Sequence, residues 1–126
     1  MSPANDVKSY RDLAVWQLGL QIVDVVYGLS TAFSSDERFG LTSQLRRAAA
    51  SIPADIAEGH ARSSTKDFVR HLSITVGSLA EVTTFLELAE RLAYVEHERT
   101  CKLFGLCQEE RRMLRGLQAS LRRRIK

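Results

Sequence analysis

The chain has 126 residues, of which 44% are hydrophobic and 26% charged, and its formal net charge is +3. These values are typical of one globular domain and exclude a disordered or collagen-like chain, so residues 1–126 are expected to form a single domain. The segment before Tyr10 is polar and lacks an apolar signal core, and no stretch approaches the roughly 20 apolar residues of a membrane span. We therefore expect a cytoplasmic protein without a membrane partner.

Hydrophobic periodicity predicts four helices separated by short breaks, at about 12–31, 42–62, 65–91 and 96–122. The chain contains only 2 Pro and 7 Gly, and no apolar run of period two indicates a strand. Four helices of this length with short connections favour an all-α, up-down-up-down four-helix bundle.

The first predicted helix begins at Asp12, a candidate cap, and is apolar on more than one face. A bundle buries one stripe per helix, so a second apolar face indicates either a subunit interface or an unusually deep helix, and we expect the interface. The stripe predicted to face the core is Leu13, Trp16, Leu20, Val23 and Tyr27. The residues predicted to lie at the subunit interface are Ile22, Val25, Val26 and Leu29.

The second and third predicted helices have clear starting signals. Thr42 or Ser43 is expected to cap the second helix, which is rich in small residues that let a neighbouring helix approach closely. Ser64, three residues before Asp67, resembles a capping box and predicts the start of the third helix. The core stripes of these helices are predicted to be Leu45, Ala48, Ile52 and Ile56, followed by Phe68, Leu72, Thr75, Leu79, Val82, Leu86 and Ala89.

The excess of positive charge lies in the last quarter of the chain. Residues 95–126 carry nine basic and four acidic side chains, a net charge of +5. In the fourth helix an apolar stripe that includes Cys107 is expected to lie opposite a polar one, formed by Arg111, Arg115, Gln118, Arg122 and Lys126. This asymmetry indicates either a polyanionic partner or a solvated helix end.

The sequence lacks the patterns that metal or covalent chemistry requires. The three histidines are scattered, no Glu-x-x-His pair is present, and Cys101 and Cys107 fall on different helical faces. Asp55 and Glu58 are the candidates for an acid/base pair, but the spacing of Glu58 and Arg62 predicts an ordinary ion pair. We expect no metal, no cofactor and no enzymatic activity.

Two groups of basic residues are candidates for nucleic-acid binding, because Lys and Arg side chains neutralise phosphates. Few aromatic residues accompany them, so binding is expected to be directed to the backbone and only weakly sequence-specific. Alternatively, each group is simply a solvated helix face. For Arg46 and Arg47 a further alternative is that they are paired with other side chains or lie at an interface. The candidates are Arg46, Arg47, Arg62, Lys66 and Arg70 in one group and Arg111, Arg115 and Arg122 in the other.

Several motifs resemble a bacterial family of four-helix bundle proteins, which is named for intervening sequences in 23S rRNA genes. They are Tyr10-Arg11-Asp12-Leu13-Ala14-Val15-Trp16-Gln17, Gly40-Leu41-Thr42-Ser43-Gln44-Leu45-Arg46-Arg47-Ala48-Ala49, Ser51-Ile52-Pro53 with Ile56-Ala57-Glu58-Gly59, and Gly77-Ser78-Leu79-Ala80-Glu81. They keep the order and spacing of the family over about residues 9–95, although Asp55 stands where relatives usually have Asn.

The resemblance implies a bundle that assembles into a ring-like homopentamer. Related proteins include the accessory factor of diversity-generating retroelements, a basic pentamer that binds nucleic acid and a reverse transcriptase. Two functions therefore stay open. One is a non-enzymatic homo-oligomeric scaffold that binds RNA or DNA through its basic surface. The other is a protein-interaction adaptor, in which the basic residues serve subunit or partner contacts.

Overall fold

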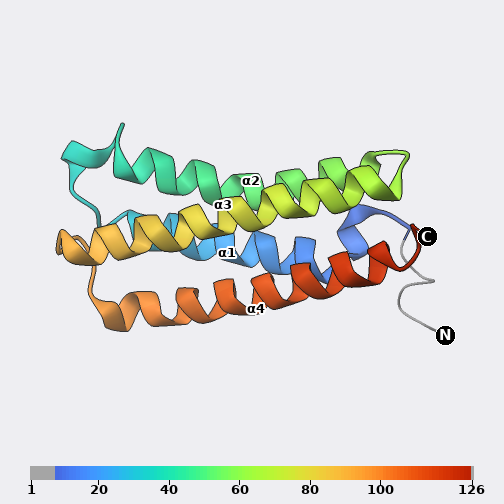
Figure 1. Cartoon of the computed structure of the whole chain (residues 1–126). Coiled ribbons are helices and arrows are strands. Elements are labelled where there is room, and N and C mark those ends of the chain that lie inside the picture. The colour runs from blue at the N-terminus through green and yellow to red at the C-terminus, as the bar shows by residue number, and fades with distance from the viewer. Residues whose placement is uncertain (1–7, 126) are drawn as a thin grey trace.

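The computed structural model describes residues 8–125, over which the chain forms four long helices and two 3-10 turns and no strand. Consecutive helices run in opposite directions, and the α2–α3 turn lies at the same end as the start of α1 and the end of α4 (Figure 1). The prediction of an all-α protein of four helices is confirmed, and the observed bounds differ from the predicted ones by at most two residues. The elements are η2 (Tyr10–Asp12), α1 (Ala14–Ser30), η3 (Ser35–Glu37), α2 (Leu41–Ala61), α3 (Thr65–Arg91) and α4 (His97–Arg122).

The starts of the helices differ from the predicted caps. Asp12 does not cap α1, because its carboxylate accepts the backbone N–H of Ser9 and closes the η2 turn, whereas Leu13 precedes α1 without a side-chain cap. Helix α2 begins at Leu41, one residue before the predicted caps, and its first N–H donates to Glu37 Oε1 at 3.0 Å. The predicted cap of α3 is present, since Ser64 Oγ accepts the N–H of Asp67 at 2.9 Å.

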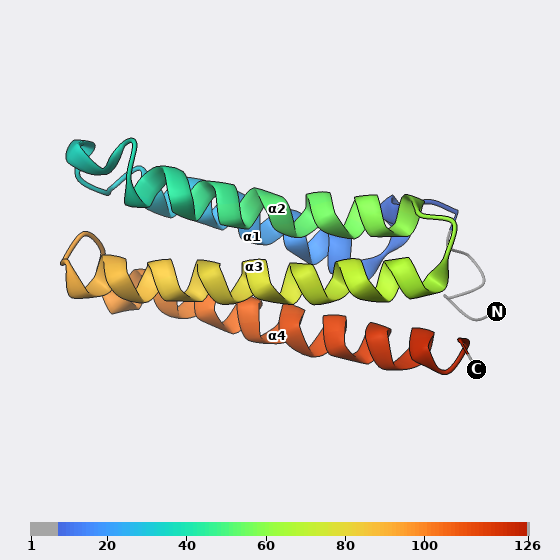
Figure 2. The ribbon, with the colours of Figure 1, turned by 45° about the horizontal axis from the view of Figure 1, so that its top comes forward.

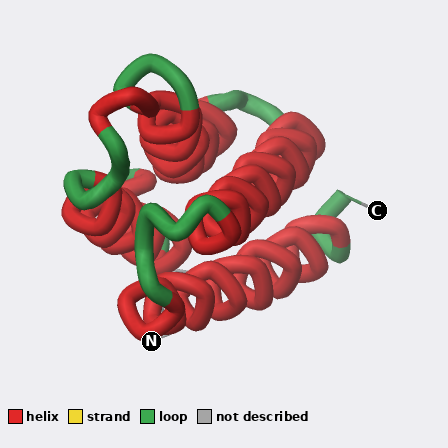
Figure 3. The backbone as a smooth tube through the Cα atoms, turned by 90° about the vertical axis from the view of Figure 1, so that its left-hand side faces the viewer, coloured by secondary structure: helices red, strands yellow, loops and turns green. Residues whose placement is uncertain are grey.

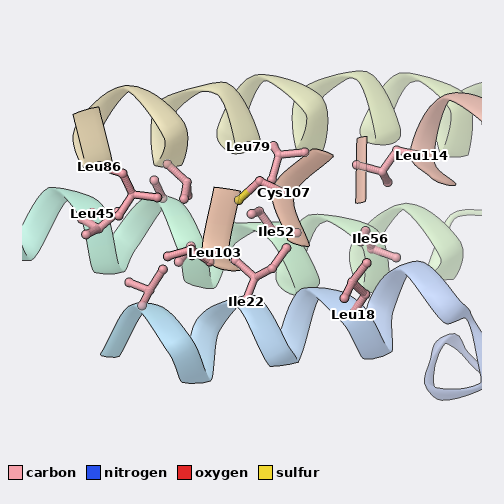
Figure 4. Packing of buried hydrophobic residues seen from close by; sticks show 14 of the residues in the cluster. Leu18, Ile22, Leu45, Ile52, Ile56, Leu79, Leu86, Leu103, Cys107 and Leu114 are labelled. Carbon is pink, nitrogen blue, oxygen red and sulfur yellow. The ribbon is translucent and has the colours of Figure 1, made fainter. Parts of the chain in front are cut away.

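Viewed from the end that carries the α1–α2 and α3–α4 connections, the four helices surround one core (Figure 3). Its centre is filled by branched aliphatic side chains and Cys107 (Figure 4). Full burial of one such aliphatic side chain stabilises the fold by about 1.5–3 kcal/mol. Fully buried members from all four helices include Ile22, Leu45, Ile52, Ile56, Leu72, Leu86, Leu103 and Leu114.

Helix α1 turns a different face to the core than predicted. Ile22 and Val26 are 0% exposed and Leu29 is 5% exposed, so these predicted interface residues lie inside the monomer. Val25 is partly buried against the same core, while the predicted core residues Leu20 and Tyr27 are 39% and 44% exposed. The prediction is therefore wrong for Leu20 and Tyr27, whereas Leu13, Trp16 and Val23 are partly buried against the core.

The physical reason lies at Gly19. A Cβ atom at this position would stand 3.3 Å from Ile52 Cγ2 and 3.6 Å from Pro53 Cβ, so the absent side chain lets α1 approach α2 closely. This contact orients the Gly19 side of α1 towards the bundle interior. Because both faces of α1 are apolar, periodicity alone does not distinguish them.

Helix α3 is the one described helix whose length and composition match those of a membrane span. Many of its apolar residues, including Leu72, Leu79 and Leu86, are buried within the bundle against α2 and α4. The core helix of a bundle has the same composition, so this match by itself does not indicate a membrane.

Candidate nucleic-acid interface

A buried glutamine sets the register of α3 against α4. The Gln118 side chain is 0% exposed, and its Nε2 donates to the carbonyl of Val69 at 3.1 Å and to Ser73 Oγ at 2.8 Å. Arg115 Nη1 in turn donates to Gln118 Oε1 at 2.9 Å. The second half of α4 therefore lies beside the first half of α3 (Figure 2).

This register places basic residues from distant parts of the sequence in the same half of the α3–α4 hairpin. We call them the basic half-face, and all of its members are exposed: Lys66, Arg70, Arg111, Arg112, Arg115 and Arg122. Residues 65–80 and 111–125 together carry eight basic side chains and one acidic side chain, a net charge of +7. Residues 81–110, which form the other half of the hairpin, carry three basic and seven acidic ones, a formal net charge of −4, although one of the seven, Glu110, is buried. The hairpin is thus strongly polarised along its length.

One cavity lies in the groove between α3 and α4, and a second lies on α4 beside it, since both are lined by Gln108 and Arg111. One has a volume of about 320 Å³ and is lined by Val76, Leu79, Ala80, Thr83, Cys107, Gln108 and Arg111. The other has a volume of about 540 Å³ and is lined by Gln108, Arg111, Arg112 and Arg115. The apolar part of the groove therefore adjoins a surface of α4 that is bordered by arginines.

The predicted group on α2 and α3 is divided by the structure. Arg47 lies 15 residues before Arg62 on α2, which corresponds to about 22 Å along a helix. Arg62 and Lys66 lie at the α2–α3 end of the bundle, where Arg62 Nη2 is 3.0 Å from Glu58 Oε2, the predicted ion pair. Only Lys66 and Arg70 of this group lie in the same half of the hairpin as the α4 arginines.

Arg46 has a structural role. Its Nε donates to Ser30 Oγ at 2.8 Å, and its Cζ lies 4.6 Å from the centroid of the Tyr27 ring. Arg46 thereby fastens α2 to the end of α1, which matches the paired alternative considered for it. Arg47 is exposed, with no hydrogen bond or ion pair to another residue in the range 8–125.

Sequence reasoning missed three arginines of this region. Arg112 lines the same cavity as Arg111 and Arg115, and Arg123 and Arg124 are exposed directly after α4. A signal was present, because residues 111–124 contain six arginines and no acidic residue. The prediction considered a single stripe of the fourth helix, and these three arginines lie outside that stripe. Lys126, the last member of that stripe, lies outside the described residues.

Asp55 and Glu58, the candidate acid/base pair, have different surroundings. Asp55 is half-buried, and its pKa is raised by burial and by the charge of Glu58, while the nearby His71 acts in the opposite direction. Glu58 is exposed and paired with Arg62. No group of three or more potential metal ligands is present within residues 8–125.

A second acidic residue is buried in the core, and sequence reasoning did not identify it. Glu110 is 0% exposed, and neither carboxylate oxygen has a hydrogen-bond partner among the described residues. Burial, with a contribution from Glu109, raises the pKa of Glu110 to about 8. Burial, with a contribution from Glu110, raises the pKa of the Cys107 thiol to about 12. Glu110 is therefore protonated at neutral pH, and Cys107 is an unreactive thiol.

The outer surface of α1 is largely apolar, and at its Tyr27 end it adjoins Arg38, Arg46 and Arg47. Together with the adjoining side of α2 it forms a surface that we call the outer α1–α2 face, which combines large side chains of α1 with small ones of α2: Trp16, Leu20, Val23, Tyr27, Ala50, Ala54 and Ala61. The contact of Arg46 with Tyr27 shows that the two helices adjoin along this side. Between residues 13 and 33, Asp24 is the sole charged residue. An exposed apolar patch of this kind commonly marks a protein contact.

Comparison with known proteins assigns a family. The model of the 23S rRNA-intervening sequence protein family matches residues 11–116. A solved structure from Bacteroides thetaiotaomicron VPI-5482, described as a protein with unknown function from the S23 ribosomal protein family, has the same fold with a TM-score of 0.76. The two chains are 24% identical over 83% of this chain and 98% of the other. No curated protein matches the chain. The chain belongs to the 23S rRNA-intervening sequence protein family.

Proposed function

We propose that this protein is a non-enzymatic, homo-oligomeric helical scaffold that binds nucleic acid through the basic half-face. The observation that supports this function is the polarised α3–α4 hairpin, in which one half carries a net charge of +7 although the whole chain carries +3. Exposed Lys and Arg side chains neutralise phosphates and release their counterions, which favours association at low salt. One acidic residue, Asp67, lies among the eight basic residues of these segments.

Self-association would occur through the outer α1–α2 face. Leu20 and Tyr27 are large, exposed and next to the small side chains of α2, which suits close packing against a second copy. The resemblance to pentameric proteins suggests five copies. Five copies would carry about +15 in total and present five basic half-faces to one polyanion, which increases affinity through multivalency.

The nucleic-acid function is tested with two variants that remove equal charge from opposite halves of the hairpin. The test variant is Arg111→Ala/Arg112→Ala/Arg122→Ala, and the control is Arg91→Ala/Arg99→Ala/Lys102→Ala. Binding of labelled RNA is measured for both and for the wild type at about 50 and 200 mM salt. We expect tight, salt-sensitive binding by the wild type and the control. For the test variant we expect weaker binding. The slope of log binding constant against log salt concentration should also be shallower, by about one for each phosphate that the variant no longer contacts. Absence of wild-type binding at the lower salt would contradict the proposal.

A protein-interaction adaptor is the alternative, and the groove between α3 and α4 favours it. Val76, Leu79 and Ala80 line an apolar cavity beside Arg111, an arrangement that suits an amphipathic helix bearing acidic residues. Capture from nuclease-treated lysate distinguishes the two functions. A protein partner that survives this treatment and no longer binds after Ala80→Glu substitution would favour the adaptor.

A further inference from the structure

The basic half-face has no aromatic platform for stacking bases. Within residues 8–125 the exposed aromatic residues are Tyr27 and Phe39, which belong to α1 and to the α1–α2 connection. On α3 and α4, Phe68 is buried, and Phe85 and Phe104 are partly buried against the core. Proteins that hold single strands without sequence preference stack successive bases on exposed aromatic rings. This surface therefore offers cationic side chains for phosphates and no aromatic ring on which bases could stack.

The spacing of the arginines favours a ligand of high charge density. Arg111 and Arg122 are 11 residues apart on one straight helix, which corresponds to about 16 Å. A duplex presents one phosphate charge per about 1.7 Å of its axis, whereas each strand presents one per about 3.4 Å. About ten phosphate charges of a duplex fall within this length, against about five of an extended single strand. A set of basic side chains spaced along one helix therefore gains more from a duplex.

The acidic half of the hairpin limits where a duplex can lie. Exposed carboxylates continue along the same helices beyond the basic half-face, among them Glu81 and Glu87 on α3 and Glu98 and Glu109 on α4. A duplex aligned along the whole hairpin would bring its phosphates against these like charges, which opposes binding. Docking across the basic half alone avoids this repulsion.

We propose, building on the nucleic-acid binding proposed above, that the ligand of the basic half-face is a double-stranded nucleic acid. Its phosphates contact Lys66 and Arg70 on one helix and the arginines of α4 on the other. The carboxylates of residues 81–110 keep it off the rest of the hairpin. Contacts of this kind to phosphates carry no sequence information, so we expect affinity to depend little on base sequence.

The first experiment compares a blunt RNA duplex with an oligouridine strand of equal length, which does not pair with itself. Binding of both to the wild-type protein is measured at the same salt concentration. We expect the duplex to bind several-fold more tightly, because its phosphate charge density along the axis is about twice that of a single strand. Equal or tighter binding of the single strand would overturn this inference and leave nucleic-acid binding intact. Failure of both probes to bind would overturn the proposed function itself.

The second experiment tests the repulsion. Glu81→Gln/Glu87→Gln removes two carboxylates from the acidic half, and Asp24→Asn/Asp36→Asn removes two from α1 and the α1–α2 connection as a control of equal charge. Circular dichroism verifies that both variants are helical. We expect the hairpin variant to bind the duplex several-fold more tightly than the control, because its carboxylates are closer to the phosphates. An equal gain in both variants would show that net charge alone sets affinity and would overturn the proposed placement.

Discussion

The carboxylate of Glu110 lies against Gly19, so that a Cβ atom on this glycine would stand 3.3 Å from Glu110 Oε2. The same Cβ would stand 3.3 Å from Ile52 Cγ2, and both neighbours are fully buried. A core glycine in α1 thus accommodates a buried acid from α4. The close approach of α1 to α2 and the position of Glu110 depend on one another.

Gly19→Ala is expected to destabilise the protein. Alanine gains up to about 1 kcal/mol of helix propensity over glycine, but overpacking a filled core costs about 1–3 kcal/mol. Because Ile52 and Glu110 are both fully buried and would each stand 3.3 Å from the new Cβ, we expect a net loss of about 1 kcal/mol in the free energy of unfolding, measured by urea denaturation. Gly77→Ala is the control, since a Cβ there meets nothing within 4 Å, and it should stabilise the protein by about 0.5–1 kcal/mol. Equal stabilisation by both substitutions would show that Gly19 is not tightly packed.

Glu110 should make stability depend on pH. Its pKa is about 8 in the folded protein and near 4.5 when unfolded, so the folded state binds more protons between these values. The contribution of Glu110 to the free energy of unfolding is therefore complete below about pH 4.5 and is lost as pH rises through 8. We expect the free energy of unfolding to fall by a few kcal/mol over this range, since each pKa unit corresponds to about 1.4 kcal/mol.

Substitution of this residue checks the assignment. Glu110→Gln has no proton to lose and should flatten the pH profile of unfolding, whereas Glu109→Gln, its exposed neighbour, should retain it. Urea midpoints measured at pH 5 and pH 8.5 distinguish the two variants. If Glu110→Gln keeps the full slope, another group is responsible for it.

Alanine substitutions of Arg46 and Arg47 are expected to differ in their effect on stability, while neither changes RNA affinity much. Arg46→Ala removes the hydrogen bond to Ser30 and the contact with the Tyr27 ring, and we expect it to lower the free energy of unfolding by about 1–2 kcal/mol. Arg47→Ala should change stability by less than about 0.5 kcal/mol, because its side chain is exposed. Neither residue lies on the basic half-face, so RNA affinity should change little in both. A large loss of affinity in Arg46→Ala at unchanged stability would contradict its structural role.

The sequence predicted the four helices because their apolar periodicity and the breaks between them are local signals. It did not predict which face of α1 is buried, since that depends on the fit of Gly19 against Ile52 and Pro53 across the bundle. Glu110 was missed for the same reason: a glutamate in a helix is usually solvated, and its burial follows from the space that Gly19 leaves on another helix. Such pairings join residues that are far apart in the chain.

The basic residues illustrate the same limit. Periodicity placed the α4 arginines on one stripe but wrongly assigned the buried Gln118 to it. Only the contact of Gln118 with Val69 and Ser73 shows that Lys66 and Arg70 lie beside these arginines. Grouping by sequence joined these two residues to Arg46 and Arg47 instead. The sequence shows that the segments of the hairpin differ in the sign of their charge. Only the register of α3 against α4 shows that the basic segments of the two helices lie side by side.

Leu20→Glu is expected to disrupt self-association without unfolding the monomer. Leu20 is 39% exposed in the monomer and lies at the centre of the outer α1–α2 face, so a carboxylate there costs little in the isolated bundle but is buried and unpaired in an assembly. Ile74→Glu is the matched control, because Ile74 is 45% exposed on α3, away from that face. Analytical ultracentrifugation should show a smaller species for Leu20→Glu and an unchanged one for Ile74→Glu, both with wild-type circular dichroism. If Ile74→Glu dissociates the assembly and Leu20→Glu does not, the subunits meet through α3, and the basic half-face would lie beside the contact.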